Sequence, residues 1–297
     1  MEIQDELHTL YTPHIYRAIA FITENLGERL DLEALAEAAY FSPYHFHRIF
    51  TRILGETPNV YVNRLRVERA ANLLIRNPSL SITEIALTTG FSSSAAFARS
   101  FKQYFGRSAS EWKIHYQQTI AGRNVVDTAL CQQVEANVQI KQMPRFYVAY
   151  VVSLLDGYAF HQIDEAWLRL CTWASARDLL TPDTLAIEVS YDNPDITPAS
   201  KCRYYACLTV PDRIVADNVV GVMEIPAGKC GVFRFQGPRA DIQPTYRALY
   251  SAWLPRSGYQ PPYDEPRRPC YAICGLEPEQ PEQDVFCMDI CIPVVPR

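Results

Sequence analysis

Two short stretches of the chain place polar and basic side chains at helical spacing, where they could hydrogen-bond to bases and phosphates. The first covers residues 43–54, and its outward face consists of Tyr44, His47, Arg48 and Thr51. The second lies 50 to 51 residues further on, and its outward face consists of Ser94, Ala95, Arg99 and Lys102. Arginine is the side chain best matched to the O6 and N7 acceptors of guanine. An arginine at the same outward place in both stretches favours DNA contact over a helical bundle with a merely polar outer face.

The opposite face of each stretch is apolar. In the first, the stripe has the spacing i, i+3, i+4 and i+7 and consists of Phe46, Ile49, Phe50 and Ile53. In the second, it consists of Phe97, Phe101, Tyr104 and Phe105. A helix that enters the major groove must bury one face and offer the other. Both stretches are therefore predicted to be amphipathic helices.

The two helices belong to an internal repeat, in which each copy is a short helix, a turn and a longer helix. The residues that recur in the second copy include Leu30, Ala36, Phe41, Arg48 and Gly55. Their equivalents are Leu80, Ala86, Phe91, Arg99 and Gly106. A rigid connector between the copies would let the two longer helices read major-groove segments about 34 Å apart on one face of the duplex.

Capping residues mark where the helices begin. Ser81 and Glu84 have the spacing of a capping box, and Asp31 is suited to cap the matching helix of the first copy. Ser42 and Thr57 each precede a proline, which favours a helix start. The long helix after Thr57 is predicted to be the connector.

The charge of the chain is distributed unevenly around its net value of −5. Residues 41–118 hold ten Lys/Arg and four acids, a balance of +6, whereas residues 1–40 have −6 and residues 119–297 have −5. One basic surface among acidic ones is typical of a DNA contact face, although a solvated face gives the same pattern.

Composition narrows the class of protein. The 48% apolar and 21% charged content is typical of a globular chain, and 297 residues suffice for two domains. No apolar run is long enough to span a bilayer and no signal peptide is evident, so a cytoplasmic protein is expected.

All nine cysteines lie at or beyond Cys131, and His161 is the one histidine after residue 115. Reduced thiols are expected, with no metal and no cofactor.

Residues 13–117 resemble the DNA-binding domain of AraC/XylS-type transcription regulators. The resemblance is carried by Leu35–Ala39, Phe41–Phe50, Gly55–Pro58, Arg64–Arg66, Ile82–Ala86, Gly90–Ser92, Phe97–Lys102, Tyr104–Gly106 and Trp112. It implies a tandem helix-turn-helix fold that binds promoter DNA, with RNA polymerase as a further candidate partner. The base-reading places that it implies are Tyr44, His47 and Arg48 in the first helix and Ser94, Ala95 and Arg99 in the second. Because Ser94 and Ala95 are short, the second helix is expected to rely more on phosphate contacts or DNA shape.

The second half of the chain has mixed α+β patterning. Strands are predicted within 138–155, 185–191, 203–210, 219–225, 229–236, 270–276 and 285–293, and helices at 163–174 and 242–254. This order suggests two β-α-β-β modules that share one sheet. The expected organisation is an all-α domain over 1–118, a linker over 119–137 and an α+β domain over 138–297.

The second half resembles GyrI-like effector-binding domains. The resemblance is carried by Tyr191–Pro194, Arg203–Tyr205, Ile225–Gly228, Tyr250–Gly258 and Asp289–Val294. It implies that a small organic effector binds among aromatic side chains between the two modules. The chain departs from the family at the strand that often carries a glutamate followed two residues later by a tyrosine, because it has Ala272 and Cys274 there. This departure favours an effector that is uncharged or anchored differently.

Five residues are candidates for the effector site: Tyr147, Trp173, Glu188, Trp253 and Tyr271. Each also has a structural alternative, because the tryptophans could be plain helix-to-sheet core and Glu188 could face solvent.

Together these features predict a ligand-responsive transcription regulator, by family habit an activator, with no catalytic residues. Two alternatives remain open, namely a module that sequesters a small molecule or a protein partner, and an enzyme that hydrolyses a reactive small molecule. The sequence contains no phosphate-binding glycine loop, G-x-S-x-G elbow or paired-histidine motif that would support the enzyme.

Overall fold

The computed structural model describes residues 2–123, 127–155, 160–212, 214, 216–217, 220–262, 268–275 and 285–297. It divides into two compact units, with the division of the main chain after His115. In the described part of the chain, no helix combines the length and the apolar character that crossing a bilayer requires.

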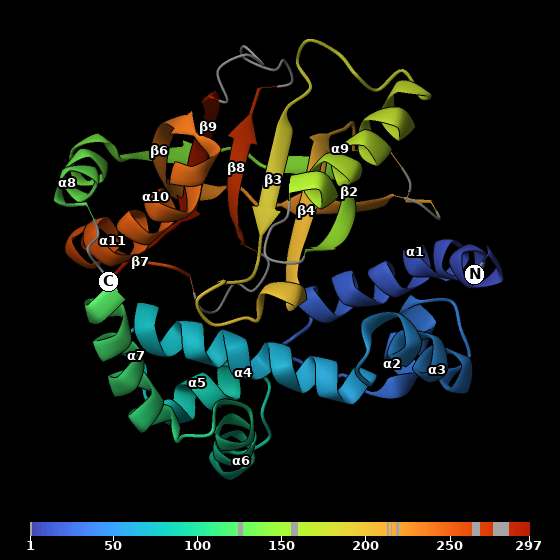
Figure 1. Ribbon diagram of the computed structural model, residues 1–297, viewed down its shortest axis with the longest axis horizontal. Coiled ribbons are helices and arrows are strands. Elements are labelled where there is room, and N and C mark those ends of the chain that lie inside the picture. Colours follow the sequence, from blue (N-terminus) through green and yellow to red (C-terminus); the bar gives the residue numbers. More distant parts are fainter. Residues whose placement is uncertain are drawn as a thin grey trace. The chain divides into compact units, whose positions relative to one another are not determined.

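The first unit is helical, which confirms the predicted fold class. Its helices are α1 (Glu2–Glu24), α2 (Leu32–Ala38), α3 (Pro43–Leu54), α4 (Pro58–Arg76), α5 (Ile82–Thr88), α6 (Ser94–Phe105) and the first part of α7 (Ala109–Arg123), which crosses the division. Helices α2 and α3 form the first helix-turn-helix pair, and α5 and α6 form the second. Helix α4 runs from one pair to the other (Figure 1) and packs on α3, α5 and α6.

Most of the expected caps are present. The Asp31 side chain accepts a hydrogen bond from a backbone amide in the first turn of α2, and Ser81 and Glu84 form a reciprocal capping box on α5. The Thr57 side chain likewise accepts a hydrogen bond from the Val60 backbone amide in the first turn of α4. Ser42 differs, because its side chain makes no capping hydrogen bond even though α3 begins at the following proline.

The turn between the two helices of each pair requires a left-handed backbone. Tyr40 has φ 57° in the first copy, and Gly90 has φ 85° at the equivalent place in the second. A Cβ atom on Gly90 would come within 2.6 Å of the Leu26 carbonyl oxygen, so this turn has no room for a side chain. In the first copy, the Tyr40 side chain is accommodated because it points outward and is 72% exposed.

The second unit is built on one antiparallel sheet of eight strands. The strands are β1 (Gln139–Met143), β2 (Phe146–Leu155), β3 (Ala186–Ser190), β4 (Cys202–Thr209), β5 (Gly221–Ile225), β6 (Gly228–Pro238), β8 (Cys270–Cys274) and β9 (Val285–Pro293). Their order is β1-β6-β9-β8-β3-β4-β2-β5. A separate two-stranded sheet pairs β7 (Tyr259–Gln260) with β10 (Val295–Pro296).

The helical segments of this unit are α8 (Thr128–Asn137), α9 (Phe160–Ser175), α10 (Ile242–Ala248), a π-helical turn η3 (Leu249–Trp253) and α11 (Leu254–Arg256). Two short 3-10 turns, η1 (Ala199–Lys201) and η2 (Arg239–Asp241), precede β4 and α10.

The predicted pair of β-α-β-β modules is confirmed, as β2-α9-β3-β4 and β6-α10-β8-β9, and the modules join where β3 pairs with β8. The strand that precedes each module in the chain pairs with the first strand of the other module. Strand β1 precedes β2 in the chain but pairs with β6, and β5 precedes β6 but pairs with β2. The predicted strand over 138–155 is therefore two strands that lie at different places in the sheet.

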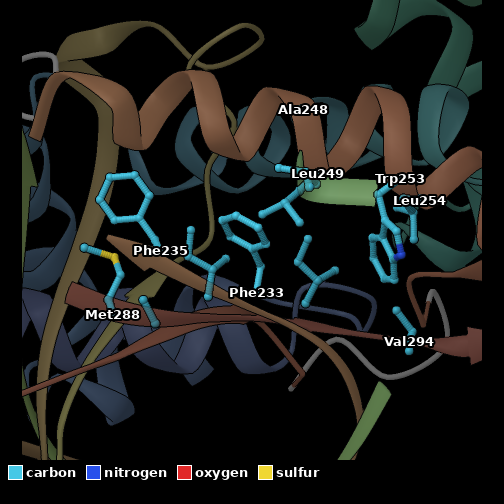
Figure 2. Packing of buried hydrophobic residues seen from close by; sticks show 12 residues of the cluster. Phe233, Phe235, Ala248, Leu249, Trp253, Leu254, Met288 and Val294 are labelled. Carbon is cyan, nitrogen blue, oxygen red and sulfur yellow. The ribbon is translucent and has the colours of Figure 1, made fainter. Parts of the chain in front are cut away.

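Helices cover one face of the sheet in two separate clusters. Leu170 and Trp173 of α9 pack over Val151 and Leu208 of the first module. In the second module the α10–η3–α11 segment packs on β6 and β9, with Leu249, Trp253 and Leu254 over Phe233 and Phe235 (Figure 2). The central strands β3 and β8 lie between the two helical coverings (Figure 1).

The segment expected as a linker, 119–137, contains the end of α7 and all of α8. Helix α8 belongs to the second unit, because Val134 is fully buried in the cluster of the second module. We propose the domain limits 1–118 and 138–297, with α8 folding as part of the second domain.

Candidate DNA-binding surface and effector site

The outward face of α3 is open to solvent. Tyr44 is 78% exposed, and His47 and Arg48 are exposed beside it. Thr51 is partly exposed, and its hydroxyl donates a hydrogen bond of 2.7 Å to the His47 carbonyl oxygen. Thr51 can therefore offer DNA a lone pair, while its proton is used within the helix. The apolar stripe behind this face is anchored by Phe46 and Phe50, both fully buried.

Helix α6 repeats this arrangement with shorter side chains. Ala95, Arg99 and Lys102 are exposed, whereas Ser94 is partly buried and its hydroxyl hydrogen-bonds to the Thr83 hydroxyl of α5 at 3.3 Å. The first turn of α6 thus presents little hydrogen-bonding capacity beyond Ser94, and the charged groups follow in the second and third turns.

Arg48 and Arg99 occupy equivalent places on the two helices. Within the described ranges, neither guanidinium makes an ion pair or a side-chain hydrogen bond. Each keeps its planar fork of donors available for a bidentate contact with guanine or a phosphate.

A buried ionic network connects the two helix-turn-helix pairs. Arg64 of α4 contacts Glu56, just after α3, at 2.7 Å and Glu68, one turn further along α4, at 3.2 Å. The Tyr104 hydroxyl of α6 donates a hydrogen bond of 2.5 Å to the same Glu68 carboxylate. These contacts tie the end of α3 to α6 through α4, so the network helps to fix the spacing of the two recognition helices.

The protonation of this network follows from its burial. Burial opposes the charge on Arg64, but the hydrogen bond to Glu56 and the charge of Glu68 outweigh it and raise the pKa of Arg64. Burial and the adjacent Glu68 carboxylate raise the pKa of the Tyr104 hydroxyl, which stays a donor. The sequence placed Tyr104 on the apolar stripe of α6 and did not identify the polar role of its hydroxyl.

In the second unit, Glu188 lies at the centre of the sheet. It is on β3 and pairs in register with Ala206 of β4 and with Ala272 of β8. Register partners point to the same face, here the face covered by the helices. The position at which the sequence lacks an acid, Ala272, therefore has a carboxyl group directly across from it on the neighbouring strand.

Side chains from both modules approach Glu188. The Trp167 indole of α9 donates a hydrogen bond of 2.8 Å to the Tyr204 hydroxyl, and the Tyr204 hydroxyl hydrogen-bonds to the Glu188 carboxylate. Burial raises the pKa of the Tyr246 hydroxyl of α10, and the nearby Cys270 and Glu188 raise it further. We call Glu188, Trp167, Tyr204 and Tyr246 the Glu188 cluster.

Burial raises the pKa of the Glu188 carboxyl above its ordinary value, against the hydrogen bond from Tyr204 and the positive charge of Arg239. The side chain is nevertheless only partly buried, so solvent can reach it. A partly accessible acid among aromatic rings is suited to an organic cation.

The other four predicted effector residues do not join this cluster. Trp173 and Trp253 lie in the two helix-to-sheet cores, where a Cβ atom at Gly231 would come within 2.1 Å of the Trp253 ring. Tyr147 lies on β2 beneath the Arg145 guanidinium, 4.7 Å from its ring centroid. Tyr271 neighbours Ala272 in the strand and points to the opposite face, where its hydroxyl lies 3.9 Å from Cys230 Sγ.

Sequence patterns contained part of the signal for the members of the cluster that were missed. Trp167 falls on the apolar stripe of α9, and Tyr204 and Tyr205 are consecutive on β4, so their side chains point to opposite faces of the sheet. Neither pattern shows that Glu188 of β3 lies next to them. Among the described residues, which include all nine cysteines, no cysteine forms a disulfide. Among the described residues, no group of three His, Cys, Asp or Glu side chains is arranged to hold a metal ion.

Comparison with known proteins yields two family matches. Residues 136–295 match the family model of the GyrI-like small molecule binding domain, and residues 35–114 match that of a helix-turn-helix domain.

Individual relatives match over about a third of the chain. The XylDLEGF operon transcriptional activator of Pseudomonas putida is 34% identical over 112 residues, which are 37% of this chain and 35% of the relative. The HTH-type transcriptional activator AarP of Providencia stuartii is 33% identical over 108 residues, 36% of this chain and 79% of the relative. The solved DNA-binding domain of AdpA in complex with a target DNA is 30% identical, with a TM-score of 0.34, and the match covers 35% of this chain and 94% of that one. The chain thus spans about a third of the length of the Pseudomonas relative.

Proposed function

We propose that this chain, which belongs to the GyrI-like small-molecule binding family and carries an AraC-type helix-turn-helix domain, is a transcription regulator whose DNA binding responds to a small organic ligand. The observation that carries the proposal is a pair of exposed arginines at equivalent places, Arg48 on α3 and Arg99 on α6. Within the described residues, neither guanidinium makes an ion pair or a side-chain hydrogen bond. We assign base contacts to Tyr44, His47 and Arg48 and a phosphate contact to Lys102. The hydroxyls of Thr51 and Ser94 donate their protons within the domain, so each can accept a hydrogen bond from a base amino group. Arg99, which shares the outward face of α6 with Ala95, contacts a base or a phosphate.

For the second domain, we propose that the effector binds at the Glu188 cluster. The sequence alone favoured an uncharged or a differently anchored ligand because Ala272 replaces an acid. Since Glu188 is the register partner of Ala272, we expect the second of these, an aromatic cation held by the Glu188 carboxylate and by the rings of Trp167 and Tyr246. Trp173 and Trp253 then contribute indirectly, because they belong to the hydrophobic cores that position α9 and η3.

We further propose activation as the mode of regulation and RNA polymerase as a partner, because the relatives described above are named transcriptional activators. Such a regulator would act in the cytoplasm, where the DNA is.

The full chain is expected to bind DNA from upstream of its own gene about a thousandfold more tightly than random DNA of equal length at the same salt concentration. Fluorescence anisotropy on both DNAs measures this ratio. Weak binding that is equal on the two DNAs, with and without an aromatic cation, would contradict the proposal. A ligand whose affinity is the same with and without the specific DNA would instead indicate a sequestering module, because coupling between two sites is reciprocal.

A further inference from the structure

A second junction joins the two helix-turn-helix pairs, on the other side of α4 from the buried ionic network of Arg64. Arg66 lies two residues beyond Arg64 on α4, a step that turns the side chain by about 200° around the helix axis. The Arg66 Nε donates a hydrogen bond of 3.0 Å to the Leu26 carbonyl oxygen, and its Nη2 donates one of 2.5 Å to the Glu28 carbonyl oxygen. Both acceptors belong to the segment between α1 and α2. The Arg66 guanidinium therefore ties the segment that leads into the first pair to the connecting helix.

The turn of the second pair lies against the same atoms. A Cβ atom on Gly90, between α5 and α6, would come within 2.6 Å of the Leu26 carbonyl oxygen and within 2.9 Å of Arg66 Nε. A Cβ atom on Gly27 would come within 3.1 Å of the Thr88 carbonyl oxygen at the end of α5. The backbone of the second pair thus packs directly on the segment that leads into the first, and the Arg66 guanidinium lies beside the place where they meet.

We call Arg66 together with residues 26–28 and 88–90 the Arg66 junction. The Arg64 network ties the end of α3 to α6 on one side of α4, and the Arg66 junction ties the segment before α2 to the turn before α6 on the other. One attachment alone would let the pairs turn about α4 relative to each other. With attachments on opposite sides, a rotation that relieves one of them strains the other, so α3 and α6 keep one rotational relation as well as one spacing.

We propose that Arg66 is a positioning residue that fixes the rotation of the second recognition helix relative to the first, and thereby the spacing of the two DNA segments that the chain accepts. This inference rests on the proposed DNA binding and gives it a determinant of specificity that does not touch the DNA. One base pair inserted between the two segments moves the second by about 3.4 Å along the duplex and rotates it by about 34–36°. Two recognition helices in one fixed relation cannot follow that change, so one of them loses its base contacts.

The test uses the full chain and two duplexes, the DNA from upstream of its own gene and the same DNA with one base pair inserted between the two segments that footprinting locates. The unsubstituted chain is expected to bind the lengthened duplex about thirtyfold more weakly, the usual effect of losing the base contacts of one arginine. Arg66→Lys keeps the positive charge, but a single ammonium group does not reproduce the planar fork that reaches both carbonyl oxygens. The insertion should weaken the binding of this variant only about fivefold, because its second pair can turn to follow the displaced segment.

The ratio of the two affinities within one variant is the readout, because a smaller folded fraction lowers both affinities by the same factor. Arg66→Gln is the second variant, since its shorter side chain cannot span the two carbonyl oxygens, and it should also lose about fivefold. Arg29→Lys is the matched control. Arg29 is exposed in the same segment, and within the described ranges its guanidinium makes no ion pair or side-chain hydrogen bond. This control should keep the thirtyfold loss.

Random DNA of equal length separates this inference from the proposed function. If the unsubstituted chain prefers the upstream DNA to random DNA but tolerates the insertion, or if both Arg66 variants keep the thirtyfold loss, the positioning role of Arg66 is wrong and the proposed function stands. If the unsubstituted chain binds random DNA as tightly as the upstream DNA, the proposed function is wrong and the positioning role is wrong with it.

Discussion

Alanine at both Arg48 and Arg99 is expected to abolish most of the preference of the chain for its specific DNA. A base-reading arginine contributes about 1–3 kcal/mol of discrimination. The two side chains lie on separate recognition helices, and effects at distant sites usually add. The double variant should therefore lose about 2–6 kcal/mol of specific binding free energy, with Arg48→Ala accounting for the larger share because the first helix has the longer polar side chains. Anisotropy titrations on specific and random DNA measure both quantities.

The matched control is Arg169→Ala, which removes an exposed arginine from α9 in the second unit. It should leave both affinities unchanged. If the double variant loses the same factor on specific and random DNA, the two arginines contact phosphates and do not read bases.

Arg64→Met is expected to destabilise the first domain by about 3–5 kcal/mol, the usual effect of removing one partner from a buried ion pair. Methionine preserves much of the side-chain volume, so the loss comes from leaving Glu68 and Glu56 without their shared cation. Only 6% of the Arg64 side chain and 4% of that of Glu68 are exposed, and solvent cannot compensate. Hydrogen exchange of the amides in α4 and α6 of the full chain, measured at increasing urea concentrations, gives the free energy of unfolding of the first domain separately from that of the second.

Arg52→Met provides the comparison, because Arg52 is exposed on α3 and such substitutions usually change stability by about 0.5 kcal/mol or less. Exchange in β3 and β4 of the second unit should be the same in both variants. Faster exchange confined to the ends of α4, with α6 protected as before, would mean that the network does not connect the two helix-turn-helix pairs.

Local signals in the sequence were sufficient for the first domain. Its helices begin at side-chain caps such as Asp31 and Ser81, and its apolar stripes specify which face of α3 and α6 is buried. The repeat showed that both pairs have the same form. The Arg64 network escaped detection because its acids come from α4 itself and from the segment after α3, and only packing shows that Tyr104 joins them.

The second domain shows where such reasoning fails. Strand and helix periodicity located its two modules, but nothing in a single strand indicates that β1 and β5 are exchanged between them. The same limit applies to the effector site. Alignment by motif identified a missing acid at Ala272, whereas the β3–β8 register was needed to find Glu188 opposite it. Pairing between distant segments decides both features, and it depends on the packing of the whole sheet.

Hydroxyl-radical footprinting of the full chain on its specific DNA tests most directly whether two recognition helices act together. Two helices held by one connector should protect two segments of the backbone, about 10–10.5 base pairs apart from centre to centre, on one face of the duplex. This spacing is expected whether α6 reads bases or phosphates, because both contacts protect the backbone. A single protected segment, or two segments on opposite faces of the duplex, would contradict the account.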